Sequence, residues 1–162
     1  MELESQSRAR EKFERIMTAV VSEIGERPLD AALETHLRRT FPVDGREFAS
    51  LVALIGQGVA EGWLCQRTAA GIRFGRALKP GGPAGYFSVD VVEMHDIKGP
   101  HHVHPEGEIG LIAPIDAEAR FDGMSSGWYV YSPGSDHWPT VTGGKAHILY
   151  LLPHGAIEFT GR

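Results

Sequence analysis

The sequence predicts an α+β protein, in which a helical segment with a β-hairpin is followed by a small, mainly β barrel. Three observations indicate this fold. Residues 13–62 carry apolar side chains at helical spacing, residues 86–159 divide into short β-rich runs separated by turn residues, and seven of the eight histidines lie in that second part. A length of 162 residues suits one domain, or a compact domain with a small appendage.

Apolar residues spaced three and four apart predict three helices in the N-terminal part. The first helix ends at Gly25, and the second begins at Pro28, because proline is favoured in the first turn of a helix. Asp44 and Glu47 resemble a capping box that opens the third helix, and Gly62 ends it.

A β-hairpin is expected next, with residues 63–68 and 72–78 flanking a short turn. The Pro-Gly break that follows divides the chain into a helical cap, residues 1–80, and a barrel, residues 84–162. Three helices and a hairpin are also the element order of a winged helix. Residues 1–80 carry 12 basic and 11 acidic side chains, a balance that favours a cap or dimerisation element over DNA binding.

Six short runs rich in β-branched and aromatic residues predict the strands of the barrel: 86–92, 109–115, 117–121, 128–131, 146–152 and 156–159. This part holds 4 basic and 10 acidic residues among positions 81–162. Such an acidic, histidine-rich segment repels phosphate backbones and attracts cations, so the sequence argues against a nucleic-acid partner.

Two short stretches indicate a metal site. His102 and His104 lie two residues apart, so on a strand both point to one face, and Glu108 shares their parity. A Pro-Gly turn would bring His137 from a neighbouring strand to the same point. Three imidazoles and one carboxylate suit a single divalent ion of iron, manganese, zinc or nickel. Glu106 also has the parity of Glu108 and is an alternative ligand.

These stretches resemble the two signature motifs of the cupin superfamily, small β-barrels with a metal in the mouth. The first family motif is His-x-His followed after three or four residues by Glu, and the second runs from Gly through Pro and Gly to His. The matching positions are His102, His104, Glu108, Gly127, Pro133, Gly134 and His137. The resemblance implies a metal-binding barrel over residues 84–162, but it does not specify a reaction.

A narrower resemblance covers most of the chain. The helical start, the Pro-Gly break and the run His-His-Val-His-Pro-Glu-Gly-Glu are similar to the bacterial 4-hydroxylaminobenzoate lyase family, as is the run His137-Trp138-Pro139. This resemblance implies an enzyme of nitroaromatic degradation. It would convert 4-hydroxylaminobenzoate to protocatechuate and release ammonia.

Such a reaction needs a general acid that protonates the leaving group. The candidates in reach of the motifs are Glu106, His101 and His147. His101 has the opposite parity to His102, and His147 shares its parity with apolar neighbours, so a core position is an equally good interpretation of His147.

Aromatic side chains could stack on the substrate ring, and the candidates are Trp138, Tyr129 and Tyr131, which could equally be ordinary core. The basic candidates for the substrate carboxylate are Lys98, Arg120 and Lys145.

Two other classes of function stay open. The same ligands would support a dioxygenase or an isomerase, and a non-catalytic sensor would bind a small ligand in the barrel. The expected partners are a small aromatic acid and a second copy of the chain, since a barrel of this size has little core of its own. The acidic, polar start and the single Cys65 predict a cytoplasmic protein without a signal peptide or a membrane segment.

Overall fold

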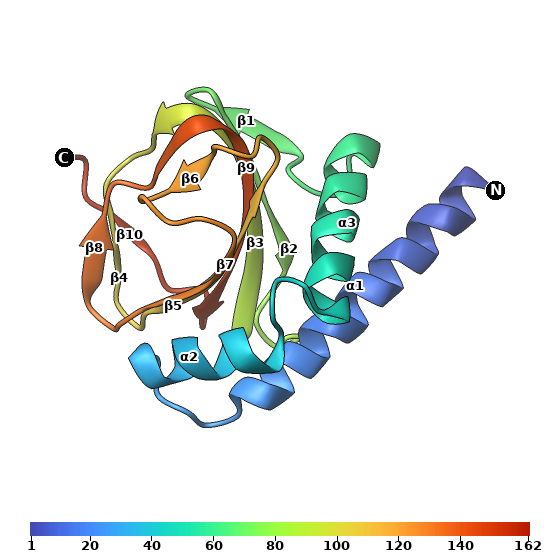
Figure 1. Cartoon of the computed structure of the whole chain (residues 1–162), viewed down its shortest axis with the longest axis horizontal. Coiled ribbons are helices and arrows are strands. Elements are labelled where there is room, and N and C mark those ends of the chain that lie inside the picture. Colours follow the sequence, from blue (N-terminus) through green and yellow to red (C-terminus); the bar gives the residue numbers. More distant parts are fainter.

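The computed structural model describes residues 1–162 and contains three helices followed by ten strands (Figure 1). The helices are α1 (Glu2–Ile24), α2 (Ala31–Thr40) and α3 (Arg46–Glu61). The strands are β1 (Arg67–Ala69), β2 (Ile72–Leu78), β3 (Phe87–Lys98), β4 (His102–His104), β5 (Glu108–Pro114), β6 (Arg120–Phe121), β7 (Gly127–Tyr131), β8 (Ser135–His137), β9 (Thr140–Pro153) and β10 (Glu158–Phe159).

The strands form two antiparallel sheets. The larger follows the order β1-β2-β3-β9-β5-β7, with β6 paired to β9, and the smaller follows β10-β4-β8. Residues of both sheets line one cavity, so the sheets are the two walls of a cupin-type barrel. The predicted α+β fold with a small cupin-type barrel is therefore confirmed.

The helices cover the outer face of the larger sheet on the side away from the smaller one (Figure 1). Their apolar faces share one hydrophobic core with β3, β5 and β9. Trp128 on β7 links the two layers, because its indole donates a hydrogen bond of 3.0 Å to the carbonyl of Phe41 and its ring packs against Phe48. None of the three helices combines the length and the apolar character that crossing a membrane requires.

The helix ends confirm some predictions and correct others. Glycines follow α1 and α3 as expected, at Gly25 and Gly62. The start of α2 was wrongly placed at Pro28, because the Asp30 carboxylate accepts a hydrogen bond of 2.9 Å from the Leu33 amide and caps the helix there. The predicted capping box of α3 is also wrong, since Gly45 is its N-cap and no side chain bonds to its first turn.

The predicted hairpin is present as β1 and β2, but its first arm is shorter than expected. Trp63, Leu64 and Cys65 belong to the hydrophobic core beneath the helices instead of the strand. Across the Pro-Gly break, β2 pairs with β3 and joins the larger sheet. The division of the chain into domains 1–80 and 84–162 stays a prediction.

Cys65 should be an unreactive thiol in the folded protein. It is 2% exposed, its Sγ donates to the Val91 carbonyl, and burial raises its pKa to about 12. At pH 8 we expect no reaction of the native protein with a thiol reagent such as DTNB, and one thiol per chain once guanidinium unfolds it. Rapid stoichiometric labelling of the native protein would contradict this.

The stability of the protein should also depend on the Cys65 thiol at high pH. The thiol ionises at a lower pH in the unfolded chain than in the folded protein, because burial raises its pKa only in the folded state. The free energy of unfolding should therefore fall as the pH rises from 9 toward 12.

Candidate metal centre

The three histidines of the predicted site are brought together by two short strands of the smaller sheet. His102 and His104 lie on β4, on either side of the outward Val103. Strand β8 runs antiparallel to β4, with His137 paired to His102. Strand β4 is only three residues long, since Pro100 precedes it and a turn at Gly107 follows it. The six predicted strand runs include neither β4 nor β8, although the motifs were expected to place His102 and His104 on one strand and His137 on a neighbouring one.

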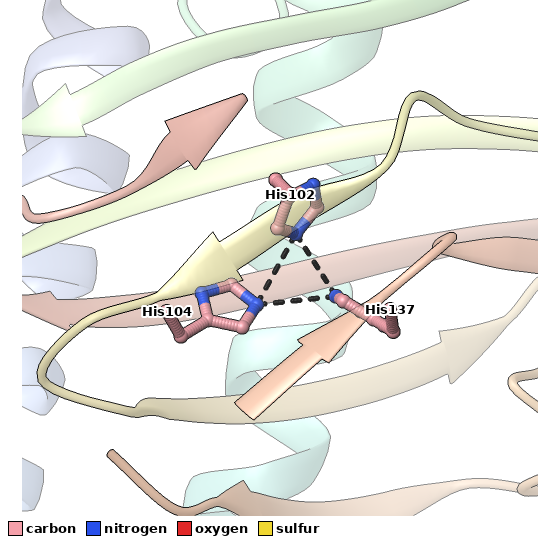
Figure 2. Close-up of side chains that lie close together, drawn as sticks. All are labelled: His102, His104 and His137. Carbon is pink, nitrogen blue, oxygen red and sulfur yellow. Dashed lines mark hydrogen bonds between the residues drawn. The ribbon is translucent and has the colours of Figure 1, made fainter. Parts of the chain in front are cut away.

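The rings point toward one another from these two strands, as Figure 2 shows. The Nε2 atom of His102 lies 3.2 Å from that of His104 and 2.9 Å from that of His137, and the third edge of this triangle is 3.1 Å. Two nitrogen ligands at right angles around a metal, with bonds of about 2.1 Å, lie about 3.0 Å apart. The triangle therefore has the dimensions of one face of a metal coordination sphere.

The positions of the hydrogen atoms on these rings also favour metal binding. Nδ1 of His102 donates to the Pro100 carbonyl at 3.1 Å, and Nδ1 of His137 donates to the Asp122 carboxylate at 2.6 Å. In the neutral rings both Nε2 atoms then carry lone pairs, so no hydrogen atom joins them, and a shared cation would satisfy both. His104 is the one ring whose tautomer is not fixed, because its buried Nδ1 has no partner.

Burial keeps these rings in the form that binds metals. It lowers the pKa of His102 to about 4, and the neighbouring His137 adds to the shift. It lowers the pKa of His104 to about 3, with His102 as the next cause. Both imidazoles are therefore neutral at physiological pH, as ligation requires.

Glu108, the fourth predicted ligand, borders the triangle at one corner. Its Oε1 lies 3.5 Å from Nε2 of His104, and its Oε2 accepts a hydrogen bond of 2.8 Å from the Tyr129 hydroxyl. Burial raises the pKa of Glu108 to about 8. Gly110, which pairs with Tyr129, makes this contact possible: a Cβ atom there would lie only 2.0 Å from the Tyr129 ring.

A cavity of about 250 Å³ opens beside the triangle. His102, His137, Glu108 and Tyr129 line it together with apolar residues, and 12 of its 17 lining residues are hydrophobic. An apolar pocket with a few convergent polar groups is the usual form of a small-molecule site. The geometry thus combines three convergent imidazoles with room for a small, largely apolar ligand.

Comparison with known proteins identifies the family. The model of the family PnbB, 4-hydroxylaminobenzoate lyase, matches residues 15–159. The chain belongs to this family. A 4-hydroxylaminobenzoate lyase of Pseudomonas putida is 28% identical over 156 residues, covering 86% of this chain and 89% of the relative. A lyase of the same name from Nocardioides sp. (strain LMS-CY) is 28% identical over 148 residues, covering 86% and 88%.

Solved structures give a weaker likeness. An uncharacterized conserved protein with a double-stranded β-helix domain from Klebsiella pneumoniae is 18% identical, covers 59% of this chain and 85% of its own, and aligns with a TM-score of 0.43.

In this member of the lyase family, the structure places the three candidate general acids away from the cavity. His101 precedes β4 and does not line the cavity, and its ring bonds to Thr160 and, at 2.7 Å, to the Asp136 carboxylate. His147 bonds to Glu93 at 2.8 Å. Glu106 pairs with His154 at the surface, so it does not replace Glu108 beside the imidazoles.

The aromatic candidates also separate. Tyr129 lines the cavity, whereas the Tyr131 hydroxyl donates a hydrogen bond of 2.6 Å to Asp122 and the Tyr131 ring packs against His137. Trp138 is 40% exposed and lies over the ring of His101. Three aromatic or apolar residues that the sequence did not single out, Phe74, Phe121 and Ile148, line the cavity instead.

Asp122 is the polar residue of the site that sequence reasoning missed. It is followed by Gly123, and an Asp-Gly pair is typical of a turn and carries no sign of a histidine partner; Asp122 adopts the left-handed backbone conformation there, with φ of 49°. Its carboxylate accepts hydrogen bonds from His137, Tyr131 and, at 2.9 Å, the Thr140 amide. Burial alone would raise the pKa of Asp122, but these hydrogen bonds hold it below its ordinary value. The ionised carboxylate fixes the orientation of the His137 ring.

Proposed function

We propose that the chain is a metal-dependent lyase that converts 4-hydroxylaminobenzoate to protocatechuate and ammonia. The observation that carries the proposal is the Nε2 triangle of His102, His104 and His137 at the wall of an apolar cavity, in a chain of the 4-hydroxylaminobenzoate lyase family. The residues that would hold the metal are these three and Glu108. Iron, manganese, zinc and nickel all suit this ligand set.

The net reaction consumes one water. The N–O bond of the hydroxylamine breaks, a hydroxyl group is added to the neighbouring ring carbon, and water replaces the nitrogen, which leaves as ammonia. When bound, a divalent ion would supply a Lewis acid for the hydroxylamine oxygen or for that water.

The chain's own residues have separate tasks in this proposal. Tyr129 holds one oxygen of Glu108, so the other oxygen stays directed toward the triangle. Asp122 holds His137 in a single orientation. The apolar wall formed by Phe74, Phe121 and neighbouring residues positions the ring and excludes bulk water.

Product analysis tests this function. Purified protein loaded in turn with each of the four metals is incubated with 4-hydroxylaminobenzoate without oxygen, and protocatechuate and ammonia are quantified. We expect the two products in equal amounts with at least one metal. Products that form only after oxygen is admitted would indicate a dioxygenase instead, and no turnover with any of the metals, with or without oxygen, would contradict the lyase.

The partner and the location of the protein rest on the sequence. We propose a homodimer in the cytoplasm, and sedimentation of the purified chain would measure its oligomeric state.

A further inference from the structure

The cavity beside the triangle contains one polar group that the proposed site does not yet use. The lining residues with polar side chains are His102, His137, Glu108, Tyr129 and Tyr150. The first four are expected ligands or, in the case of Tyr129, hold one of them. Tyr150 projects into the same cavity from β9, and its hydroxyl takes part in no hydrogen bond within the chain. This hydroxyl is free to bond to a molecule that fills the cavity.

Strand pairing places Tyr150 near the end of the cavity where the ligands converge. Tyr150 pairs with Gly110 on β5, and Gly110 pairs in turn with Tyr129 on β7. Paired residues point to the same face of a sheet, and Gly110 has no side chain, so the two tyrosines enter the barrel as near neighbours. The Tyr129 hydroxyl donates to Glu108 at 2.8 Å. Tyr150 therefore stands beside the Tyr129–Glu108 pair.

The neighbour of Tyr150 on the opposite side does not capture its hydroxyl. Asp90 on β3 pairs with Tyr150, and a free carboxylate there would be a strong acceptor. Both oxygens of Asp90 are instead bonded to Arg76, whose Nε and Nη2 donate at 3.0 Å and 3.3 Å. The Arg76–Asp90 ion pair thus leaves the hydrogen of the Tyr150 hydroxyl available to the cavity.

Tyr150 also keeps that hydrogen. Burial raises the pKa of Tyr150 well above its ordinary value, and the charges of Asp90 and Glu108 add to the shift, whereas Arg76 opposes it. The phenol is therefore neutral at physiological pH, and it can donate a hydrogen bond without becoming an anion.

The other end of the cavity fixes how a substrate would lie. Its lining there includes Ala69 and Ala70, which are exposed, and the apolar Ile72 and Met94. With the hydroxylamino group at the imidazoles, the ring of 4-hydroxylaminobenzoate would extend along the apolar wall. Its carboxylate would point to the exposed end, where water solvates it.

We propose that Tyr150 is a catalytic residue, whose hydroxyl donates a hydrogen bond to the oxygen of the substrate's hydroxylamino group. This inference rests on the proposed lyase function. The candidate acids from the sequence, His101, His147 and Glu106, do not line the cavity, so none of them supplies a donor there.

The hydrogen bond assists the cleavage of the N–O bond. When this bond breaks, its electron pair leaves with the oxygen as hydroxide. The hydroxide is neutralised by the proton that a water molecule releases when it adds to the neighbouring ring carbon. Tyr150 keeps its own proton and stabilises the negative charge that develops on the oxygen, so it acts more strongly in the transition state than in the bound substrate.

Tyr150→Phe removes the hydroxyl and keeps the ring. On metal-loaded protein we expect kcat for 4-hydroxylaminobenzoate to fall about 100-fold, the usual effect of losing one donor to a developing oxyanion. KM should rise by no more than about fivefold, because the bound substrate loses one neutral hydrogen bond. A kcat within about threefold of the wild type would overturn the inference and leave the lyase function intact. If the wild type itself forms no product, the lyase function fails.

The matched control is Tyr86→Phe. Tyr86 loses the same hydroxyl, but it is 42% exposed and stacks on Phe87. We expect its kcat and KM to equal those of the wild type, and the metal content of both variants to be unchanged. A change of the same size in both variants would show a general effect of removing a hydroxyl and would overturn the role of Tyr150.

A binding measurement tests the hydrogen bond separately from turnover. The compound 4-(hydroxymethyl)benzoate carries an oxygen where the substrate has its N–O oxygen, and 4-ethylbenzoate carries a methyl group there. Neither contains an N–O bond. Both are titrated by calorimetry into zinc-loaded wild type and Tyr150→Phe, since zinc has no redox chemistry. We expect the preference of the wild type for the hydroxymethyl compound to fall about two- to fivefold in the variant. An unchanged preference would overturn the inference whatever the turnover assay shows.

Discussion

Replacing His102 and His137 together with alanine should abolish metal binding while leaving the fold in place. The two Nε2 atoms form the shortest edge of the triangle, 2.9 Å, so the double variant keeps only one of the three convergent nitrogens. After loading and dialysis, we expect the metal content to fall from about one ion per chain to near zero, as measured by plasma mass spectrometry. Formation of protocatechuate should disappear with it.

The matched control is His154→Ala. This residue is also a histidine bonded to a carboxylate, but it lies at the surface with Glu106. We expect its metal content and activity to equal those of the wild type. Circular dichroism distinguishes loss of ligands from loss of fold in the double variant. Unchanged metal content in the double variant would refute the ligand assignment.

Asp122→Asn should weaken metal binding by about 10–100-fold, the usual effect of removing a partner that orients a metal-binding histidine. Asparagine tolerates the left-handed backbone conformation that the Asp-Gly turn requires, so the turn is kept and mainly the negative charge is lost. His137 then loses the carboxylate that fixes its tautomer and its orientation. Competition with a chelator of known affinity measures the change.

Glu106→Gln is the control for this variant, because it makes the same carboxylate-to-amide change at a surface position paired with a histidine. We expect the metal affinity of Glu106→Gln to match the wild type. If both variants bind metal as tightly as the wild type, Asp122 has no part in positioning the site.

The sequence was sufficient for the fold class and for the residues that converge. Periodicity of two on a strand placed His102 and His104 on one face, and the Pro-Gly turn before His137 indicated an adjacent strand. Both are local properties, and both are readable from spacing alone. The pairing of β4 with β8 itself was not predicted, because three residues with prolines nearby give no strand signal.

The surroundings of the site depended on contacts distant in sequence. Asp122 lies 15 residues before His137, and the antiparallel pairing of β6 with β9 brings the Asp-Gly turn to the site. His101 and His147 were candidate acids because of their neighbours in sequence, yet neither lines the cavity, and their rings bond instead to Asp136 and Glu93. A carboxylate in a turn and a histidine in a strand have no local feature that reveals their partners.

The smaller sheet has a consequence for the rigidity of the protein. None of the residues of β4, β8 and β10 belongs to either hydrophobic core, and the strand pairings of this sheet join its three strands to one another and not to the larger sheet. Segments with little buried apolar area are the first to open in a native protein. A ligand bound at His102, His104 and His137 would link β4 to β8 and oppose that opening by mass action. The ion would therefore set how long this wall stays closed, and amide hydrogen exchange in β4 and β8 would slow as metal is added.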